Sequence, residues 1–413
     1  MSTRFLPAAL STLLCLGSGL ASGLLSVSAF GQDPEAGSLS EALTRGETHL
    51  QLRLRFEAVS DDAVSKDAHA LTLRTALGYE TRRYKGWNLF VEAENVTAVG
   101  NDLYDNAGAG SLDNGVRDRP VVADPALTEI NQAGLRYTRG KTSLSLGRSE
   151  LILGDHRWVG NVGWRQNHQS FDALVVRSSA VRRLTLTYAF LDSVHRIFGD
   201  RKPMDSHLLD ARIDLAKVGT LTLYGYLLDF DRATDAAQSR DTWGAELEGE
   251  APIGGIKLLY EAEYARQRDA GNNPRHIDAG YRHLQLGAGL GRVTVRAGFE
   301  TLEGDARDGQ LSTPLATLHK LNGWADKFLV TPPEGLEDLY LSVQGEPGPI
   351  GWTVVYHRFD AESADRRYGD ELDLQLTYRT PWKQEIGFKG AFYDGETFAA
   401  DTDKLILWTS YSF

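Results

Sequence analysis

The run LQLRLRFE at residues 50–57 decides the fold class, because apolar and polar side chains alternate along it without a break. Successive side chains of a β-strand point to opposite faces, so this pattern predicts a strand with one apolar and one polar face. A soluble sandwich would bury the apolar face, whereas a membrane barrel would turn that face to lipid and the polar face to a wet lumen. The run predicts a strand and leaves both folds open.

The same alternation recurs along the chain and favours the barrel. Most of the strands that these runs predict are about 9–11 residues long, the length that crosses a bilayer at a tilt. Sandwich strands are usually shorter, about five or six residues. Further clear runs lie at 71–80, 87–94, 209–215, 258–264, 293–300 and 372–379.

The connections between the expected strands alternate between long and short. We place about 18 strands in the chain, and an even number with short periplasmic turns and long extracellular loops is typical of outer-membrane barrels. The expected strands are 48–59, 70–80, 87–97, 129–138, 142–150, 170–177, 183–191, 207–215, 219–230, 242–250, 256–267, 280–289, 292–301, 338–344, 351–359, 370–379, 384–393 and 403–413. The long loops are 60–69, 98–128, 151–169, 192–206, 231–241, 268–279, 302–337, 360–369 and 394–402. Strands 129–138 and 219–230 are ambiguous in face, and Arg148 shares parity with apolar neighbours, which predicts a bulge or a slipped boundary.

Both ends of the chain carry targeting features. Residues 1–31 predict a signal peptide, with Arg4 before an apolar stretch, and cleavage after Ala29 or after Gly31 fits equally. Residues 32–46 predict a polar periplasmic lead-in, and the barrel is expected over 47–413. The final segment KLILWTSYSF ends on Phe413 and resembles the C-terminal strand that the barrel-assembly machinery of outer membranes reads. We therefore expect the outer membrane of a Gram-negative bacterium, with its lipid and lipopolysaccharide as partners.

Composition excludes several functions. Cys15 is the single cysteine and lies in the predicted signal, so the mature chain has no disulfide. The formal net charge of −12 argues against a nucleic-acid partner. The sequence contains neither a G-x-S-x-G nor an H-E-x-x-H motif, and we expect no enzyme activity, no cofactor and no metal site.

Charged residues on the polar strand faces should line the lumen. A charge on the lipid face costs roughly 2–4 kcal/mol at mid-depth, which turns these residues inward. Their charges either pair across strands to hold the wall rigid or act on the solute. The basic set is Arg53, Arg55, Arg74, Arg136, Arg212, Arg296, Arg379 and Lys389. The larger acidic set is Glu57, Glu92, Glu94, Asp210, Asp214, Glu246, Glu248, Glu261, Glu263, Glu300, Asp373 and Glu385.

Two loops are unusual. Loop 151–169 follows the fifth strand, and we predict that it folds into the bore as a basic constriction, the alternative being an ordinary extracellular loop. Its aromatic rings could stack on sugars and its amides could bind hydroxyl groups. The pore-lining candidates in and beside it are Arg157, Trp158, Asn161, Trp164, Arg165, Asn167 and Asp172. Loop 302–337 is too apolar to be freely solvated and should pack at the mouth, with Trp324, Asp326 and Lys327 as candidates.

Two segments carry a family resemblance. GRSELILGDHRWVGNVGWRQNHQSFDAL from residue 147 and TPLATLHKLNGWADKFLVTPPEGLEDLY from residue 313 resemble the alginate-export family of outer-membrane proteins. The resemblance covers roughly residues 47–413. It implies an 18-stranded monomeric pore in which Arg157 and Arg165 occupy the family's basic positions.

The resemblance makes export of an alginate-like anionic polysaccharide the leading specific function. The predicted wall is more acidic than an exporter of a polyanion should have, so a porin for uptake of small carbohydrates or carboxylates is the first alternative. A barrel enzyme or an adhesin is the second.

Overall fold

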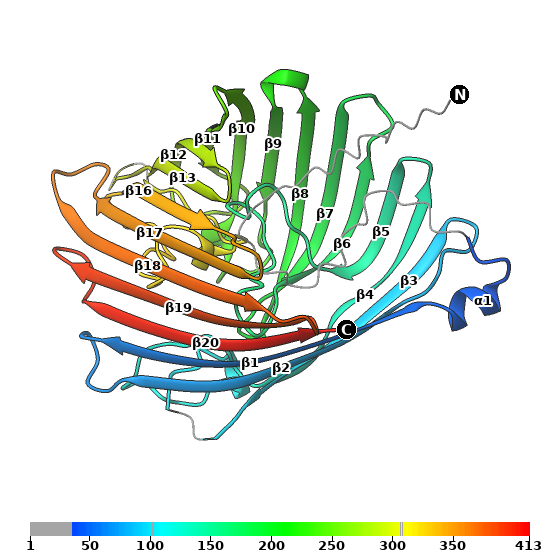
Figure 1. The fold of residues 1–413 in the computed structure, drawn as a ribbon, viewed down its shortest axis with the longest axis horizontal. Helices are drawn as coiled ribbons and strands as arrows, with labels where there is room; N and C mark the ends of the chain where they lie inside the picture. The colour runs from blue at the N-terminus through cyan, green and yellow to red at the C-terminus, as the bar shows by residue number, and fades with distance from the viewer. Residues whose placement is uncertain (1–34, 101–102, 306, 308) are drawn as a thin grey trace, which may run out of the picture.

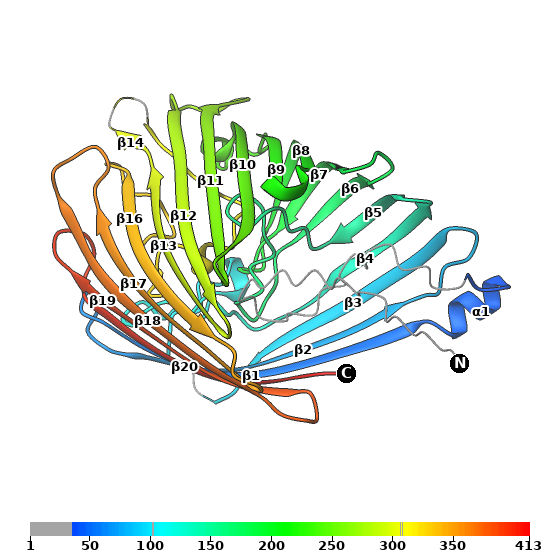
Figure 2. The same ribbon diagram turned by 45° about the horizontal axis from the view of Figure 1, so that its top comes forward.

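The chain forms a closed antiparallel β-barrel of 18 strands (Figures 1 and 2). The computed structural model describes residues 35–100, 103–305, 307 and 309–413, and the predicted signal peptide lies outside them. The first strand pairs with the second and also with the last, from Gln51 opposite Ser412 to Asp61 opposite Thr402, which closes the ring. The predicted fold class and strand number are confirmed.

The strands fall close to the predicted ranges. They are β1 (Glu47–Asp61), β2 (Ala68–Glu80), β3 (Trp87–Ala98), β4 (Leu127–Arg139), β5 (Thr142–Ser149), β6 (Ser170–Ser178), β7 (Leu184–His195), β8 (Arg201–Asp214), β9 (Thr220–Leu228), β10 (Arg240–Ile253), β11 (Ile256–Asp269), β12 (Asp278–Leu290), β13 (Val293–Leu302), β16 (Leu336–Gly345), β17 (Ile350–Asp360), β18 (Arg367–Arg379), β19 (Gln384–Gly395) and β20 (Thr402–Ser412). A separate short hairpin joins β14 (Gly304–Asp305) to β15 (Gly309–Gln310).

One predicted long loop is wrong. Residues 192–206 are mostly strand, because β7 continues to His195 and β8 already begins at Arg201. The pairing shifts register between Leu191 and Ser193, and Pro203 lies opposite Ser193. A bulge of this kind interrupts the period-two pattern on which the prediction rested.

Arg148 does not mark a bulge in its own strand, contrary to the prediction. It pairs in regular register with Ala133 and with Asp172. The shift between Asp172 and Ala173 comes from the extra residue Asp192 on the partner strand β7. In the ambiguous strand 129–138 the predicted bulge is confirmed, because Asn131 is an extra residue between Gln132, opposite Glu92, and Ile130, opposite Ala93. Arg148 shares the outer face of β5 with the exposed Leu146, and its Nε donates to Asp172 Oδ1 at 2.8 Å.

The outer wall is apolar and the inner wall is polar. Leucines such as Leu77, Leu146, Leu284 and Leu407 are more than half exposed, as lipid-facing side chains must be. Inward positions on β1 alternate with its apolar positions and include the buried Arg53 and Arg55. Among the described residues no helix is long and apolar enough to span a bilayer.

The lead-in to the barrel contains one short helix, α1 (Leu39–Thr44). The Ser38 hydroxyl caps it by accepting the Glu41 N–H at 3.1 Å. The Ala42 carbonyl accepts the Arg82 N–H from the turn after β2, which places the helix at the short-turn end of the barrel. It is drawn outside the ring of strands in Figure 1.

Loop segments occupy the inside of the ring, as Figures 1 and 2 show. A buried apolar cluster joins Leu153 and Val159 of one loop to Leu315 and Phe328 of another, and both to inward side chains such as Phe171. Val159 and Leu315 also form a backbone bridge. We call residues 150–169, residues 303–335 except 306 and 308, and the buried end of the 103–126 loop around Asp124 the lumen loops.

Candidate functional site in the lumen

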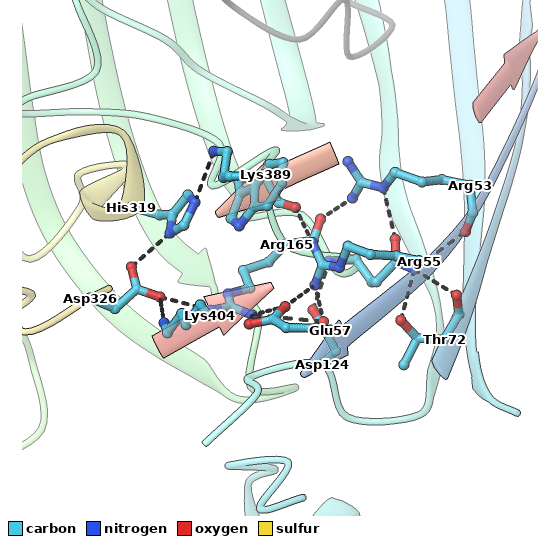
Figure 3. Close-up of polar contacts among 12 residues, drawn as sticks. Arg53, Arg55, Glu57, Thr72, Asp124, Arg165, His319, Asp326, Lys389 and Lys404 are labelled. Atoms are coloured by element: carbon cyan, nitrogen blue, oxygen red, sulfur yellow. Dashed lines mark hydrogen bonds and ion pairs between the residues drawn. The ribbon is translucent and has the colours of Figure 1, made fainter. Parts of the chain in front are cut away.

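The lumen loops are fixed to the barrel wall by buried ion pairs, shown in part in Figure 3. Arg165 donates to Glu57 of β1 at 3.2 Å and to Asp326 of the 303–335 loop at 3.0 Å. Asp326 also accepts from Lys404 of β20 at 2.6 Å and contacts His319 Nδ1 at 2.7 Å. One carboxylate thus joins two loops and one strand.

A second buried acid of this cluster, Asp124, comes from the 103–126 loop and lies 3.8 Å from Arg165. Burial alone would raise the pKa of Asp326, but His319, Lys404 and Arg165 hold it well below its ordinary value. Arg55 and Arg165 lower the pKa of Asp124 in the same way against the effect of burial. Both carboxylates are therefore charged, and the cluster is neutralised internally.

Arg157 is also buried and bonded to other residues. It is 1 % exposed, donates to Glu300 of β13 at 2.5 Å and to Asn322 at 2.9 Å, and lies over the Tyr281 ring at 5.6 Å. Arg165 is 6 % exposed. Both arginines of the predicted basic constriction are thus buried against carboxylates, so neither side chain is open to the lumen in this structure.

The loop aromatics and amides are structural as well. Trp158 Nε1 donates to Glu263 at 2.8 Å, and Trp164 stacks on His319 with ring centroids 4.7 Å apart. Asn161 donates to Glu150 at 2.6 Å and Asn167 to the Pro125 carbonyl at 2.8 Å. All four side chains are buried, and contact with a sugar in the pore stays a prediction.

The candidates outside loop 151–169 divide three ways. Trp324 packs over the Lys389 ammonium at 4.0 Å, and Lys327 forms an ion pair with Asp61 at 2.7 Å. Asp172 is not in the pore, because its neighbours Phe171 and Ala173 both pack into the lumen cluster and turn it outward. There it contacts His195 Nε2 at 2.8 Å as well as Arg148.

The basic wall residues differ in how their charge is balanced. Arg55 is bonded to Asp124, and Arg74 forms an ion pair with Glu94 at 2.5 Å. Arg212 pairs with Glu248 at 2.8 Å on the far wall and is partly exposed. Arg296 lies on β13 beside the same acidic wall.

Arg53 differs from these wall arginines in that its hydrogen bonds go to neutral oxygens. Its Nε donates to Gln166 Oε1 at 2.8 Å and its Nη1 to the Gly163 carbonyl at 3.0 Å. Its Nη2 donates to the Arg165 carbonyl. No carboxylate of the described residues forms an ion pair with it, so its charge is left without a bonded counterion.

Arg53 lines a cavity of about 200 Å³ between the wall and the 150–169 loop. Arg74 and His168 line the same space, and Gln51 and Ser410 add polar groups. We call this space the Arg53 cavity. The sequence identified Arg53 and Arg74 as lumen residues, but His168 joins them only through the fold of its loop.

The far wall carries an acidic strip on β10 and β11. The register sets Glu246 opposite Glu263 and Glu248 opposite Glu261, and like charges in such positions repel. Among the described residues, Glu261, Glu263 and His283 have donor atoms within 4.8 Å of one another and are the group that could hold a metal ion. The His283–Glu261 ion pair at 3.0 Å accounts for the contact between two of the three.

Three comparisons place the chain among known proteins. The family model described as alginate export matches residues 46–297. The chain belongs to the alginate export family. A search of curated protein sequences found no match.

Solved structures agree with the barrel of this alginate export family member. OccAB4 of Acinetobacter baumannii has a TM-score of 0.71 at 15% identity, covering 89% of this chain and 98% of that one. OpdK of Pseudomonas aeruginosa, solved with vanillate, has a TM-score of 0.70 at 16% identity over the same shares. At these identities the likeness shows the fold. Family and fold together make the chain an outer-membrane channel.

His156 should make the loop anchoring of this family member sensitive to acid. Burial lowers the pKa of His156 to about 4, and Lys320 adds to the shift. An unfolded histidine titrates near pH 6.5, so between about 6.5 and 4 the unfolded chain binds more protons. The free energy of unfolding should therefore fall as the pH falls through that window.

The measurement is denaturant unfolding at pH 7 and at pH 4.5 for the natural chain and for His156→Asn, since asparagine tolerates the positive φ of 77° found there. The variant should lose less stability on acidification than the natural chain. Equal losses in both proteins would contradict the assignment to His156.

Proposed function

We propose that this channel carries a small hydrophilic anion, a carboxylate or an acidic carbohydrate, and that the anionic group docks at the Arg53 cavity. The observation that carries the proposal is the charge of Arg53. Among the described residues Arg53 has only neutral acceptors, whereas Arg55 and Arg74 have bonded carboxylates. A buried cation without a counterion attracts an anion strongly, because the surrounding dielectric is low. A guanidinium also matches carboxylate geometry.

Export of an alginate-like polysaccharide is the second candidate, and family membership favours it. A polyuronate carries the same carboxylate that Arg53 would bind. A polysaccharide exporter would need a wide basic passage. The burial of Arg157 and Arg165 in ion pairs argues against such a passage. The chain length of the solute distinguishes the two candidates, since a small-solute channel passes monomers and is blocked by oligomers.

We further propose that the channel is monomeric and has no catalytic role. The barrel closes on itself through β1 and β20, which leaves no strand edge in need of a second subunit. Its partners would be outer-membrane lipid and lipopolysaccharide, and the assembly machinery at the strand ending in Phe413. The signal peptide would be removed by cleavage after Ala29 or after Gly31 before the protein reaches the outer membrane.

Replacing Arg53 tests the proposal. In planar bilayers with a salt gradient, Arg53→Gln should lower the anion-to-cation permeability ratio about 3- to 10-fold, on the order of 1 kcal/mol for the loss of one charge near the path. Block by vanillate or by a uronate monomer should weaken in parallel. Arg53→Lys keeps the charge and should keep most of the selectivity.

The matched control is Arg358→Gln, which removes the same charge from the outer face, where Arg358 pairs with Asp360. It should leave selectivity unchanged. An Arg53→Gln channel with natural selectivity and natural block would overturn the docking role of Arg53.

A further inference from the structure

Two neighbouring carboxyl groups on β18 are buried with an oxygen each to spare. Glu371 and Asp373 are 1 % and 0 % exposed and share the inward face of the strand. Glu371 Oε1 accepts the Ala325 N–H at 2.6 Å, and Asp373 Oδ2 accepts the Trp324 N–H at 3.1 Å. Glu371 Oε2 and Asp373 Oδ1 have no hydrogen-bond partner among the described residues.

Ionised carboxylates only accept hydrogen bonds, so two of them cannot satisfy each other. Buried polar atoms are almost always bonded, and each unsatisfied one costs about 1–3 kcal/mol. A single proton converts one group into a donor, and both spare oxygens then gain a partner. Two carboxylates that share a dry site also resist ionising together.

The charged groups around the two carboxyl groups already bond other residues. His357 of β17 bonds Asp338 of β16 at 2.9 Å through Nδ1, and its Nε2 lies 3.7 Å from Asp373 Oδ2. Lys389 of β19 contacts His319 Nε2 at 3.1 Å. None of these groups bonds the spare oxygens.

Two more charges face this region from neighbouring strands. Lys404 of β20 is bonded to Asp326 at 2.6 Å, and Glu300 of β13 is bonded to Arg157 at 2.5 Å. The positive charges available to balance two ionised carboxylates are therefore shared with other acids.

The contact with the loop is tight. Gly323 has a φ of +85°, and a Cβ atom there would clash with Glu371 Oε2. The loop backbone is pressed against the carboxyl pair. That favours a proton over a divalent cation, which needs about six or more oxygen ligands at roughly 2.0–2.6 Å.

We propose that Glu371 and Asp373 hold one proton between them, and that this protonated pair is a pH-sensitive anchor fastening residues 322–326 of the 303–335 loop to β18. Loss of the proton sets two negative charges side by side in a buried site. The loop segment then separates from β18, and the lumen widens. This inference is independent of the solute.

Infrared spectroscopy of the whole protein in lipid tests the proton directly. At neutral pH the natural chain should show the carbonyl-stretch band of a protonated carboxyl group, and the difference spectrum against Glu371→Gln should contain it. The glutamine amide can donate to Asp373 Oδ1 and accept the Ala325 N–H, so this variant should fold. Asp373→Asn offers the same replacement from the other side.

Glu248→Gln is the matched control, because Glu248 is a partly exposed lumen carboxylate paired with Arg212. Its difference spectrum should contain the loss of an ionised carboxylate and no protonated band. If neither Glu371→Gln nor Asp373→Asn removes a protonated band, the shared proton is overturned. Stability that falls on addition of a chelator and does so only in the natural chain would assign the site to a metal ion and would also overturn it.

Conductance tests the anchor. In the natural channel, single-channel conductance should rise at alkaline pH, and in Glu371→Gln it should stay near the value of the neutral natural channel. An equal rise in conductance at alkaline pH in both proteins would overturn the anchoring role. A failure of this kind leaves the Arg53 selectivity result untouched, so the two proposals are separately decided.

Discussion

Replacement of Asp326 by alanine is expected to lower the stability of the folded lumen by about 3–5 kcal/mol, the usual cost of removing one partner from a buried ionic cluster. Asp326 is bonded to Arg165 at 3.0 Å, to Lys404 at 2.6 Å and to His319 at 2.7 Å. The alanine variant would leave two buried cations without their shared acceptor. The loops should detach from β20, and water should enter.

Three readouts follow this change. Urea unfolding in lipid vesicles gives the stability, protease cleavage within 303–335 reports detachment of the loop, and single-channel conductance should increase. Asp118→Ala is the control, since Asp118 pairs with Lys66 on the surface and both are at least half exposed. The control should change none of the three. An Asp326→Ala channel with natural stability and protease resistance would show that the cluster does not hold the loops.

Replacement of Trp164 by alanine is expected to cause the second large loss of stability. Trp164 is buried beside Trp408 and His319, and the Lys389 ammonium lies 3.8 Å from its ring. Truncating a buried tryptophan to alanine costs about 3–5 kcal/mol, part of it from the cavity left behind. The loss of a desolvated cation–π contact adds to this, because Lys389 keeps only Trp324 as an aromatic partner among the described residues.

Trp164→Phe is an unusually clean control. Trp164 Nε1 has no hydrogen-bond partner among the described residues, so phenylalanine removes no hydrogen bond. It keeps an aromatic face for Lys389 and should lose much less stability than the alanine variant. Thermal unfolding of the three proteins in the same detergent makes the comparison. Equal losses in the two variants would show that ring stacking and the cation contact do not contribute.

The acidic wall that argued against a polyanion exporter has another explanation in the structure. Glu57, Glu263 and Glu300 each accept from a residue of the 150–169 loop. They neutralise or anchor that loop, so a count of wall charges alone does not give the charge that a solute meets. The residue that stands out is Arg53, whose acceptors are neutral oxygens.

The local pattern of the sequence was sufficient for the barrel. Period-two alternation, as in residues 50–57, has a direct energetic cause, since each apolar face must meet lipid and each charge must avoid it. Where that constraint relaxes, the prediction failed. Residues 192–206 contain a register shift and a proline, and the sequence there lacks the apolar–polar alternation that would have marked a strand.

The alternation of side chains along the strands also placed Arg53, Arg55 and Arg74 on the inner wall. It could not show which of them has no bonded carboxylate. That depends on partners far away in the sequence, such as Arg55 with Asp124 and Arg165 with Asp326. The 150–169 loop was recognised by its composition, yet the direction in which its side chains point was not. Arg157 and Trp158 face the wall instead of the passage.

By itself the sequence determined the number of strands, their faces and the loop that enters the bore, because these follow from periodicity and length within one segment. The tertiary structure alone decided which charges are paired, that Arg53 has only neutral acceptors among the described residues, and that the 303–335 loop covers Glu371 and Asp373. Those outcomes depend on distances of a few ångströms between segments that lie far apart in the chain. If one of these charged residues bonded a different partner, the charge that faces the lumen would change while the sequence pattern stayed the same.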